Sequence, residues 1–191
     1  DELWLEFGVW NGMSANVTAR YLAQVPGVAT VLDGFDTFTG LPERWRNFPM
    51  GSFSWRRDFP GRGLLPPVHA RVRLHEGLFR ETLPRFLASR PERQPVAWAS
   101  IDCDLESGAR DALAPLGLRL RPGTRLHFHE LLCPVRCAAG SPEPSDEARA
   151  LHAWLQTLGP GVEFELLPVT SSWQRSEEHT SELQSRQYLV C

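Results

Sequence analysis

Two pairs of polar residues follow apolar runs of the sequence. Asp102 and Asp104 come directly after the segment 96–101, and His129 and Glu130 follow a second apolar run. Such runs are typical of buried strands, and burying a lone carboxylate is costly unless a ligand, a metal or hydrogen bonds accept it. The two pairs therefore indicate a site that binds a metal ion or moves a proton. The alternative is that the acids only cap helices, since Asp104 precedes a predicted helix.

A sheet must bring these pairs to one edge, and the chain has the alternation that builds one. Strands are predicted at Leu3–Phe7, Ala29–Phe35, Arg71–His75, Val96–Ile101, Thr124–Phe128 and Val162–Val169. Helices are predicted at Ser14–Ala23, Glu81–Ala88, Glu106–Leu120 and Asp146–Leu158, with Pro115 shortening or kinking the third. This order is typical of an α/β fold with one doubly wound, Rossmann-like and mostly parallel sheet. Ligands of such sheets bind beyond the carboxyl ends of the strands.

Length and composition exclude several classes of function. The 191 residues suit one domain, with 42% hydrophobic and 23% charged residues, as in soluble globular proteins. The net charge of -3 offers no basic surface for nucleic acid or anionic lipid, and no apolar segment is long enough to span a membrane. Four cysteines do not form a disulfide scaffold, which favours a cytoplasmic location. A small-molecule partner is the remaining expectation.

Both ends of the chain are predicted to be incomplete. The sequence begins at Asp1 and enters a strand almost at once, so we expect native residues to precede it. The segment Arg175–Ser185 resembles the translation of a sequencing-library adapter, so residues 175–191 are interpreted as a non-native tail and 1–174 as the domain. The native last strand would then be absent, and Gln187–Val190 could pair in its place by accident.

The connection Phe38–His69 is unusually long and carries several aromatic residues among glycines and prolines. Long loops in compact domains tend to be lids or binding loops, so its aromatic side chains either contact a substrate or pack the loop down as a satellite core. Elsewhere, Cys103 is expected to point into the core, away from the acids beside it. His75 and His152 are interpreted as ordinary surface residues.

The first strand is followed by a turn suited to a nucleotide-like ligand. Gly8 and Gly12 let the backbone come close to a ligand, and the helix after them offers unpaired N–H groups. Asp36 ends the second predicted strand, where an acid can accept hydrogen bonds from ribose hydroxyls. The turn is not the G-x-G-x-x-G pattern of dinucleotide binding. Together these residues indicate a nucleoside-bearing cofactor.

Five segments in order resemble the class I methyltransferases that use S-adenosylmethionine, and more narrowly the macrocin O-methyltransferase (TylF-type) family. They are Glu6 to Gly12 (EFGVWNG), Gly34 to Pro42 (GFDTFTGLP), Glu76 to Pro84 (EGLFRETLP), Ile101 to Leu105 (IDCDL) and Pro122 to Glu130 (PGTRLHFHE). The resemblance implies methylation of a hydroxyl on a sugar or secondary metabolite, with a small-molecule acceptor, a possible homo-oligomer and no nucleic-acid or membrane partner.

The resemblance also implies a role for each cofactor-binding position. Gly8, Gly12 and Ser14 would lie against the methionine part of the cofactor, with Glu6 fixing the turn. Asp36 would hold the ribose. The adenine would be bordered by Gly77 and Leu78.

At the other end of the site, the resemblance implies a divalent metal, usually Mg²⁺, that lowers the pKa of the acceptor hydroxyl. It assigns Asp102 as a metal ligand and Asp104 as the general base. The chain departs from the family at the second pair, where two acids are common and this sequence has His129 and Glu130. Three alternatives follow: Glu130 suffices beside Asp102, His129 joins as a ligand of a softer ion, or no metal binds.

Other chemistries remain open at this stage. A tetrahedral zinc site could in principle use His127, His129, Cys133 and Cys137, although the cysteines lack the C-x-x-C spacing of most zinc sites. The protein could also bind the cofactor without catalysing transfer. A nicotinamide-dependent oxidoreductase is disfavoured by the missing dinucleotide pattern.

Overall fold

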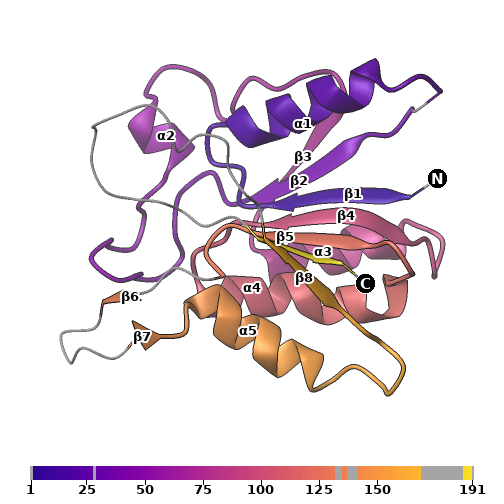
Figure 1. Ribbon diagram of the computed structural model, residues 1–191. Coiled ribbons are helices and arrows are strands. Elements are labelled where there is room, and N and C mark those ends of the chain that lie inside the picture. The colour runs from indigo at the N-terminus through magenta and orange to yellow at the C-terminus, as the bar shows by residue number, and fades with distance from the viewer. Residues whose placement is uncertain (1, 28, 132–134, 137–141, 169–186, 191) are drawn as a thin grey trace, which may run out of the picture.

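A sheet with a five-stranded parallel part forms the centre of the computed structural model, which describes residues 2–27, 29–131, 135–136, 142–168 and 187–190 (Figure 1). The parallel strands are β1 (Leu3–Phe7), β2 (Leu32–Asp36), β3 (Val72–Glu76), β4 (Val96–Ile101) and β5 (Arg125–Phe128). Their order is β3-β2-β1-β4-β5, so the chain reverses its direction of winding between β1 and β4. The predicted doubly wound α/β fold is confirmed, and the ligand cleft of such a fold lies at this reversal.

Helices cover both faces of the sheet, and each face has its own hydrophobic core (Figure 1). Helices α1 (Met13–Gln24) and α2 (Trp55–Asp58) lie on one side. The other side carries α3 (Phe79–Ala88), α4 (Glu106–Leu113), the 3-10 helix η1 (Ala114–Arg119) and α5 (Asp146–Leu155). The larger core packs β1, β4 and β5 against this second group, with Phe7, Ile101 and Phe128 fully buried.

Several predicted boundaries differ from the structure for identifiable reasons. β2 begins at Leu32 rather than Ala29, because Leu32 N donates to Arg71 O just before β3 begins and the residues before it have no partner strand. α4 ends at Leu113 and continues as a 3-10 helix with Pro115 at its start, which confirms the predicted shortening. α5 is shorter than predicted by one turn, ending at Leu155.

One strand near the edge of the sheet, β9 (Gln187–Val190), runs against the others. It pairs antiparallel with β5 and with β8 (Glu165–Pro168), as expected for a segment that pairs beside the sixth predicted strand. A separate two-stranded sheet is formed by β6 (Val135–Arg136) and β7 (Pro142–Glu143). Val169, the predicted end of the sixth strand, lies outside the described residues.

His75 differs from its predicted role as an ordinary surface residue. Its Nε2 lies 2.8 Å from Oδ1 of Asp33, and its ring stacks on Phe35 with centroids 4.5 Å apart. Asp33 is buried, so its charge needs partners, and Arg73 and Arg90 also reach its carboxylate. The sequence gives no local sign of this cluster because its members come from different elements.

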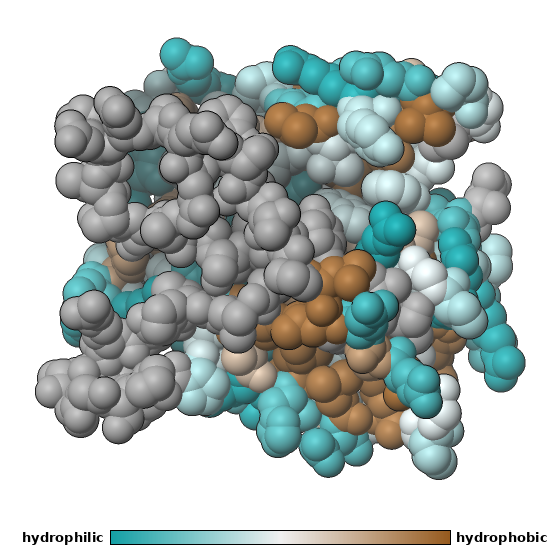
Figure 2. All heavy atoms as spheres, in the orientation of Figure 1, coloured by the Kyte–Doolittle hydropathy of each residue, from teal (hydrophilic) through white to brown (hydrophobic). Residues whose placement is uncertain are grey.

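The surface carries hydrophobic side chains over β8 and α5 (Figure 2). Leu166 and Leu167 of β8 are partly exposed there. Within the part of the chain that the structure describes, no helix is long and apolar enough to cross a membrane.

Candidate active site

A pocket of about 370 Å³ opens beyond the carboxyl ends of β1, β2 and β4, at the reversal of the sheet. Six predicted site residues line it: Gly8, Asp36, Leu78, Asp102, Asp104 and Glu130. Two further predicted residues, Gly77 and His129, contact residues that line it, whereas Glu6, Gly12 and Ser14 are not among its lining residues. The fold therefore gathers residues from the whole length of the predicted site into one place.

Gly8 is required by the approach of two strand ends. Its φ is +90°, and a Cβ placed on it would lie 1.8 Å from the carbonyl oxygen of Asp102. Asp102 N donates to Phe7 O across the same gap. The sequence predicted a close approach of a ligand at this glycine, and the structure adds that the backbone of Asp102, directly after β4, excludes a side chain there. Gly12, also in the left-handed region at φ +77°, directly precedes α1.

Asp36 holds the turn between β1 and α1. Its Oδ2 accepts hydrogen bonds from the backbone N–H groups of Val9 and Trp10, both at 2.8 Å, and its Oδ1 accepts one from Phe38 N at 2.6 Å. Burial raises the pKa of Asp36, while these backbone donors oppose the rise. The carboxylate thus fixes the turn on one side and faces the pocket on the other.

Glu6 and Ser14 join the strand to the helix behind this turn. Ser14 Oγ donates to Glu6 Oε1 at 2.7 Å. Burial, with smaller contributions from Asp102 and Asp36, raises the pKa of Glu6 to about 8. A neutral Glu6 near pH 7 is consistent with its expected role of fixing the turn, because the buried side chain then carries no charge.

The expected adenine border lies after β3. Gly77 has φ +136°, and its N–H donates to Asp36 O at 2.9 Å. Leu78 directly precedes α3 and lines the pocket together with Phe79. These positions present backbone and apolar surface, as expected for a neutral, flat ring.

Asp104 lies at the acidic end of the pocket with a left-handed backbone, φ +61°. Burial first, and then the charges of Asp102 and Glu130, raise the pKa of Asp104 to about 8. A side chain with this pKa is mostly protonated at pH 7, and its ionised fraction, which grows as pH rises towards 8, can accept a proton. Cys103, between the two acids, is buried in the core as predicted, and burial raises the pKa of its thiol well above the ordinary value.

The second predicted pair, after β5, contacts two charged partners. Nδ1 of His129 lies 3.2 Å from Oδ2 of Asp102, and Oε2 of Glu130 lies 2.9 Å from Nη2 of Arg46. Glu130 N also donates to Oε2 of Glu147, a fully buried acid whose pKa is raised well above its ordinary value, chiefly by burial. This end of the pocket therefore contains more carboxylates than cations among the residues described.

The donor types fit a divalent cation, since Asp102 and Glu130 offer carboxylate oxygens and His129 an imidazole nitrogen. The described part of the chain nevertheless contains no group of three or more His, Cys, Asp or Glu side chains arranged to hold an ion. Of the three predicted ligands, His129 and Asp102 contact each other, whereas the Glu130 carboxylate pairs with Arg46. For the zinc alternative, the rings of His127 and His129 lie 4.5 Å apart, as expected on one strand face, while Cys133 and Cys137 lie outside the described residues.

Aromatic residues of the long connection form a wall of the pocket. Trp45, Phe48 and Phe53 line it with Trp10, and their rings contact one another in a chain from Trp10 to Trp45. Trp55 instead belongs to the core beneath α1. The predicted packing role is therefore seen in Trp55, and contact of the pocket-lining aromatic residues with a substrate stays a prediction.

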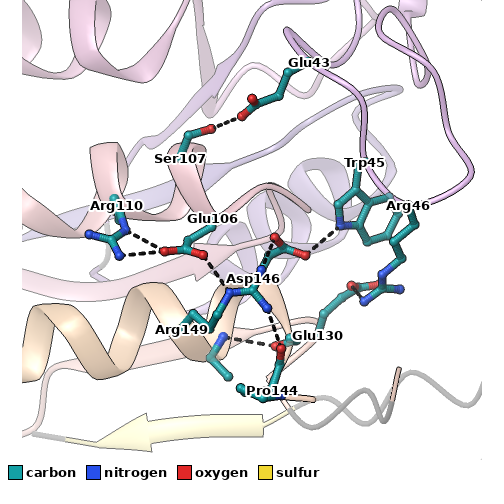
Figure 3. Close-up of polar contacts among 12 residues, drawn as sticks. Glu43, Trp45, Arg46, Glu106, Ser107, Arg110, Glu130, Pro144, Asp146 and Arg149 are labelled. Carbon is teal, nitrogen blue, oxygen red and sulfur yellow. Dashed lines mark hydrogen bonds and ion pairs between the residues drawn. The ribbon is translucent and has the colours of Figure 1, made fainter. Parts of the chain in front are cut away.

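Three functional candidates were missed by the sequence reasoning. Arg46 reaches Glu130 from the long connection, and Ser107 of α4 donates to Glu43 (Figure 3). Glu147 of α5 accepts a hydrogen bond from Glu130 N. Their partners are distant in sequence, so local patterns could not reveal them. In the sequence, the aromatic residues near Arg46 were the only indication that its segment could border a binding site.

A family model described as "Methyltransferase domain" matches residues 5–131, more than half of the chain. Among solved structures, the chain is similar to the calicheamicin methyltransferase CalS11, with 23% identity, a TM-score of 0.65 and coverage of 100% of this chain and 72% of that one. The O-methyltransferase NovP gives 17% identity, a TM-score of 0.58 and coverage of 100% and 72%. TomG from Streptomyces achromogenes, solved with S-adenosylmethionine, gives 15% identity, a TM-score of 0.55 and coverage of 99% and 72%. No curated protein sequence matches the chain significantly.

Proposed function

Because the chain belongs to the family of methyltransferase domains, we propose that it transfers a methyl group from S-adenosylmethionine to a hydroxyl of a small molecule. One observation carries the proposal: a single pocket is lined at one end by Gly8, Asp36 and Leu78 and at the other by Asp102 and Asp104. The first end suits a nucleoside, and the second suits proton removal from a hydroxyl.

The cofactor would supply an activated methyl group on a sulfonium. Asp36 would accept a hydrogen bond from the ribose while its other bonds keep the turn in place. Gly12 and Ser14 at the start of α1 would face the methionine end, and Gly77 and Leu78 would border the adenine. Glu6 would act indirectly, by holding Ser14.

Asp104 is proposed as the general base. As the acceptor oxygen bonds to the methyl carbon and the carbon–sulfur bond breaks, the hydroxyl proton passes to the Asp104 carboxylate. Its place on the pocket wall makes it accessible to an acceptor, and its raised pKa means that the ionised form needed for this step grows as pH rises towards 8. A divalent metal bound by Asp102 and Glu130, with His129 beside them, would lower the pKa of the hydroxyl.

The acceptor is proposed to be a sugar or secondary-metabolite hydroxyl, as in the macrocin type. Support comes from the neighbours, since CalS11 is described as a TDP-rhamnose 3'-O-methyltransferase. The aromatic wall of Trp10, Trp45 and Phe48 suits the apolar face of a sugar or an aromatic ring. The same proposal assigns residues 1–174 to the methyltransferase domain.

The test is methyl transfer from labelled S-adenosylmethionine to a panel of deoxysugar nucleotides, glycosides and phenols. Wild-type protein should label at least one acceptor class, and Asp104→Asn should bind the cofactor normally but transfer at least a hundredfold more slowly. Cofactor binding without any transfer would favour the second candidate, a cofactor-binding protein that does not catalyse transfer. That candidate is favoured by His129, which replaces an acid common in the family.

A further inference from the structure

Three side chains of residues 43–46, here called the strap, bridge the pocket to different elements (Figure 3). Glu43 accepts from Ser107 Oγ of α4. Trp45 Nε1 donates to Asp146 Oδ2 at the start of α5, at 3.3 Å. Arg46 pairs with Glu130 after β5. The strap is thus fastened to the opposite wall through side chains rather than through a sheet or helix.

Arg46 is held in place from two directions. Its Cζ lies 4.2 Å from the centre of the Trp45 ring, which is the geometry of a cation–π contact. Its own backbone has φ +51°, a conformation that a residue with a side chain adopts only where its surroundings enforce it. The guanidinium is therefore positioned by the strap.

The charge of Arg46 acts on the acidic end of the pocket. The carboxylate of Glu130 that it contacts is almost fully buried, and Arg46 lowers the pKa of Asp104 whereas Asp102 and Glu130 raise it. The guanidinium of Arg46 thus occupies the Glu130 carboxylate that a divalent ion would also need as a ligand. Two cations that share one buried carboxylate repel each other.

We propose that Arg46 is a built-in cation that competes with a divalent metal for Glu130, so that metal binding releases the strap from the pocket. The inference rests on the proposed function, because it concerns the metal expected at that site. Metal loading and opening of the pocket to an acceptor would then be one coupled event.

The experiment measures Mn²⁺ affinity by calorimetry and electron paramagnetic resonance on chelator-treated protein. Arg46→Gln should bind Mn²⁺ at least ten times more tightly than wild type, a difference of about 1.4 kcal/mol. Arg62→Gln is the matched control, since it removes the same charge from an exposed position in the same long connection. Its affinity should equal that of wild type, which excludes an effect of net charge alone.

Two further measurements keep the outcome clear. Adding Glu130→Gln to Arg46→Gln should abolish the gained affinity, and saturating Mn²⁺ should speed hydrogen exchange of residues 43–48 in the wild type. Equal Mn²⁺ affinity in Arg46→Gln and Arg62→Gln, or no binding to either, would overturn the proposal. Cofactor titration of each variant reports folding and the proposed function separately, so failure of the two ideas can be told apart.

Discussion

Replacing Gly8 by alanine tests whether the first turn is constrained by the backbone of β4. The new Cβ would lie 1.8 Å from Asp102 O, and contacts below 3.0 Å are essentially never observed for real Cβ atoms, so the strand ends would have to separate by 3.0 − 1.8 = 1.2 Å. The φ of +90° adds a cost of about 1–2 kcal/mol for a residue with a side chain.

That separation would weaken two hydrogen bonds at the strand ends, Gly8 N to Phe35 O at 3.0 Å and Asp102 N to Phe7 O at 2.9 Å. At about 1 kcal/mol each, the total loss is about 3–4 kcal/mol of unfolding free energy. This is a large part of the stability of an ordinary domain but leaves it folded in water. Urea unfolding followed by tryptophan fluorescence measures the loss, and cofactor affinity should fall with it.

Gly61→Ala is the matched control for backbone strain. Gly61 has φ +79°, but a Cβ placed on it would meet no atom within 4 Å. The control should therefore lose only the conformational cost, about 1–2 kcal/mol. If Gly8→Ala is no less stable than Gly61→Ala, the reasoning about the contact with β4 is refuted.

Three further changes probe the parts around the pocket. Burial raises the pKa of Glu6 from 4.5 to about 8, so the unfolded chain loses that proton first and stability falls as pH rises between these values. The fall in unfolding free energy between pH 5 and pH 8, up to ~4 kcal/mol, should disappear in Glu6→Gln. Urea unfolding at the two pH values measures it. Asp36→Asn, which weakens the bonds from Val9 and Trp10, should cost about 1.5–3 kcal/mol and lower cofactor affinity in calorimetry. Ser145→Ala removes the cap of α5 and should lower the unfolding free energy by about 1 kcal/mol.

The framework of the fold was predictable because it depends on local patterns. The bounds of β1 and β4 were predicted to the residue, since an apolar run buried on both faces has few alternatives. Strand order places the carboxyl ends of β1, β2 and β4 together, which is why Gly8, Asp36 and Asp104 could be assigned to one site before any coordinates were known.

The rest depended on contacts between distant segments. The partner of Glu130 is Arg46, 84 residues away, and no periodicity connects them. The contact of His75 with Asp33 was not predicted, because Asp33 is on the neighbouring strand. The predicted reason for a glycine at position 8, the approach of a ligand, was also incomplete. The atom that excludes a side chain there belongs to Asp102. Such pairs are fixed by tertiary packing, which a sequence pattern does not encode locally.

Calorimetric titration of S-adenosylmethionine tests the central claim most directly, using the full chain and the Asp36→Ala variant with Asp111→Ala as a second pocket-wall control. The structure places Asp36 at the turn after β1 and Asp111 on α4. We expect one cofactor bound per wild-type chain, with affinity lost in Asp36→Ala and largely kept in Asp111→Ala. A folded wild-type protein that binds no cofactor, or binds it equally well without Asp36, would contradict the account.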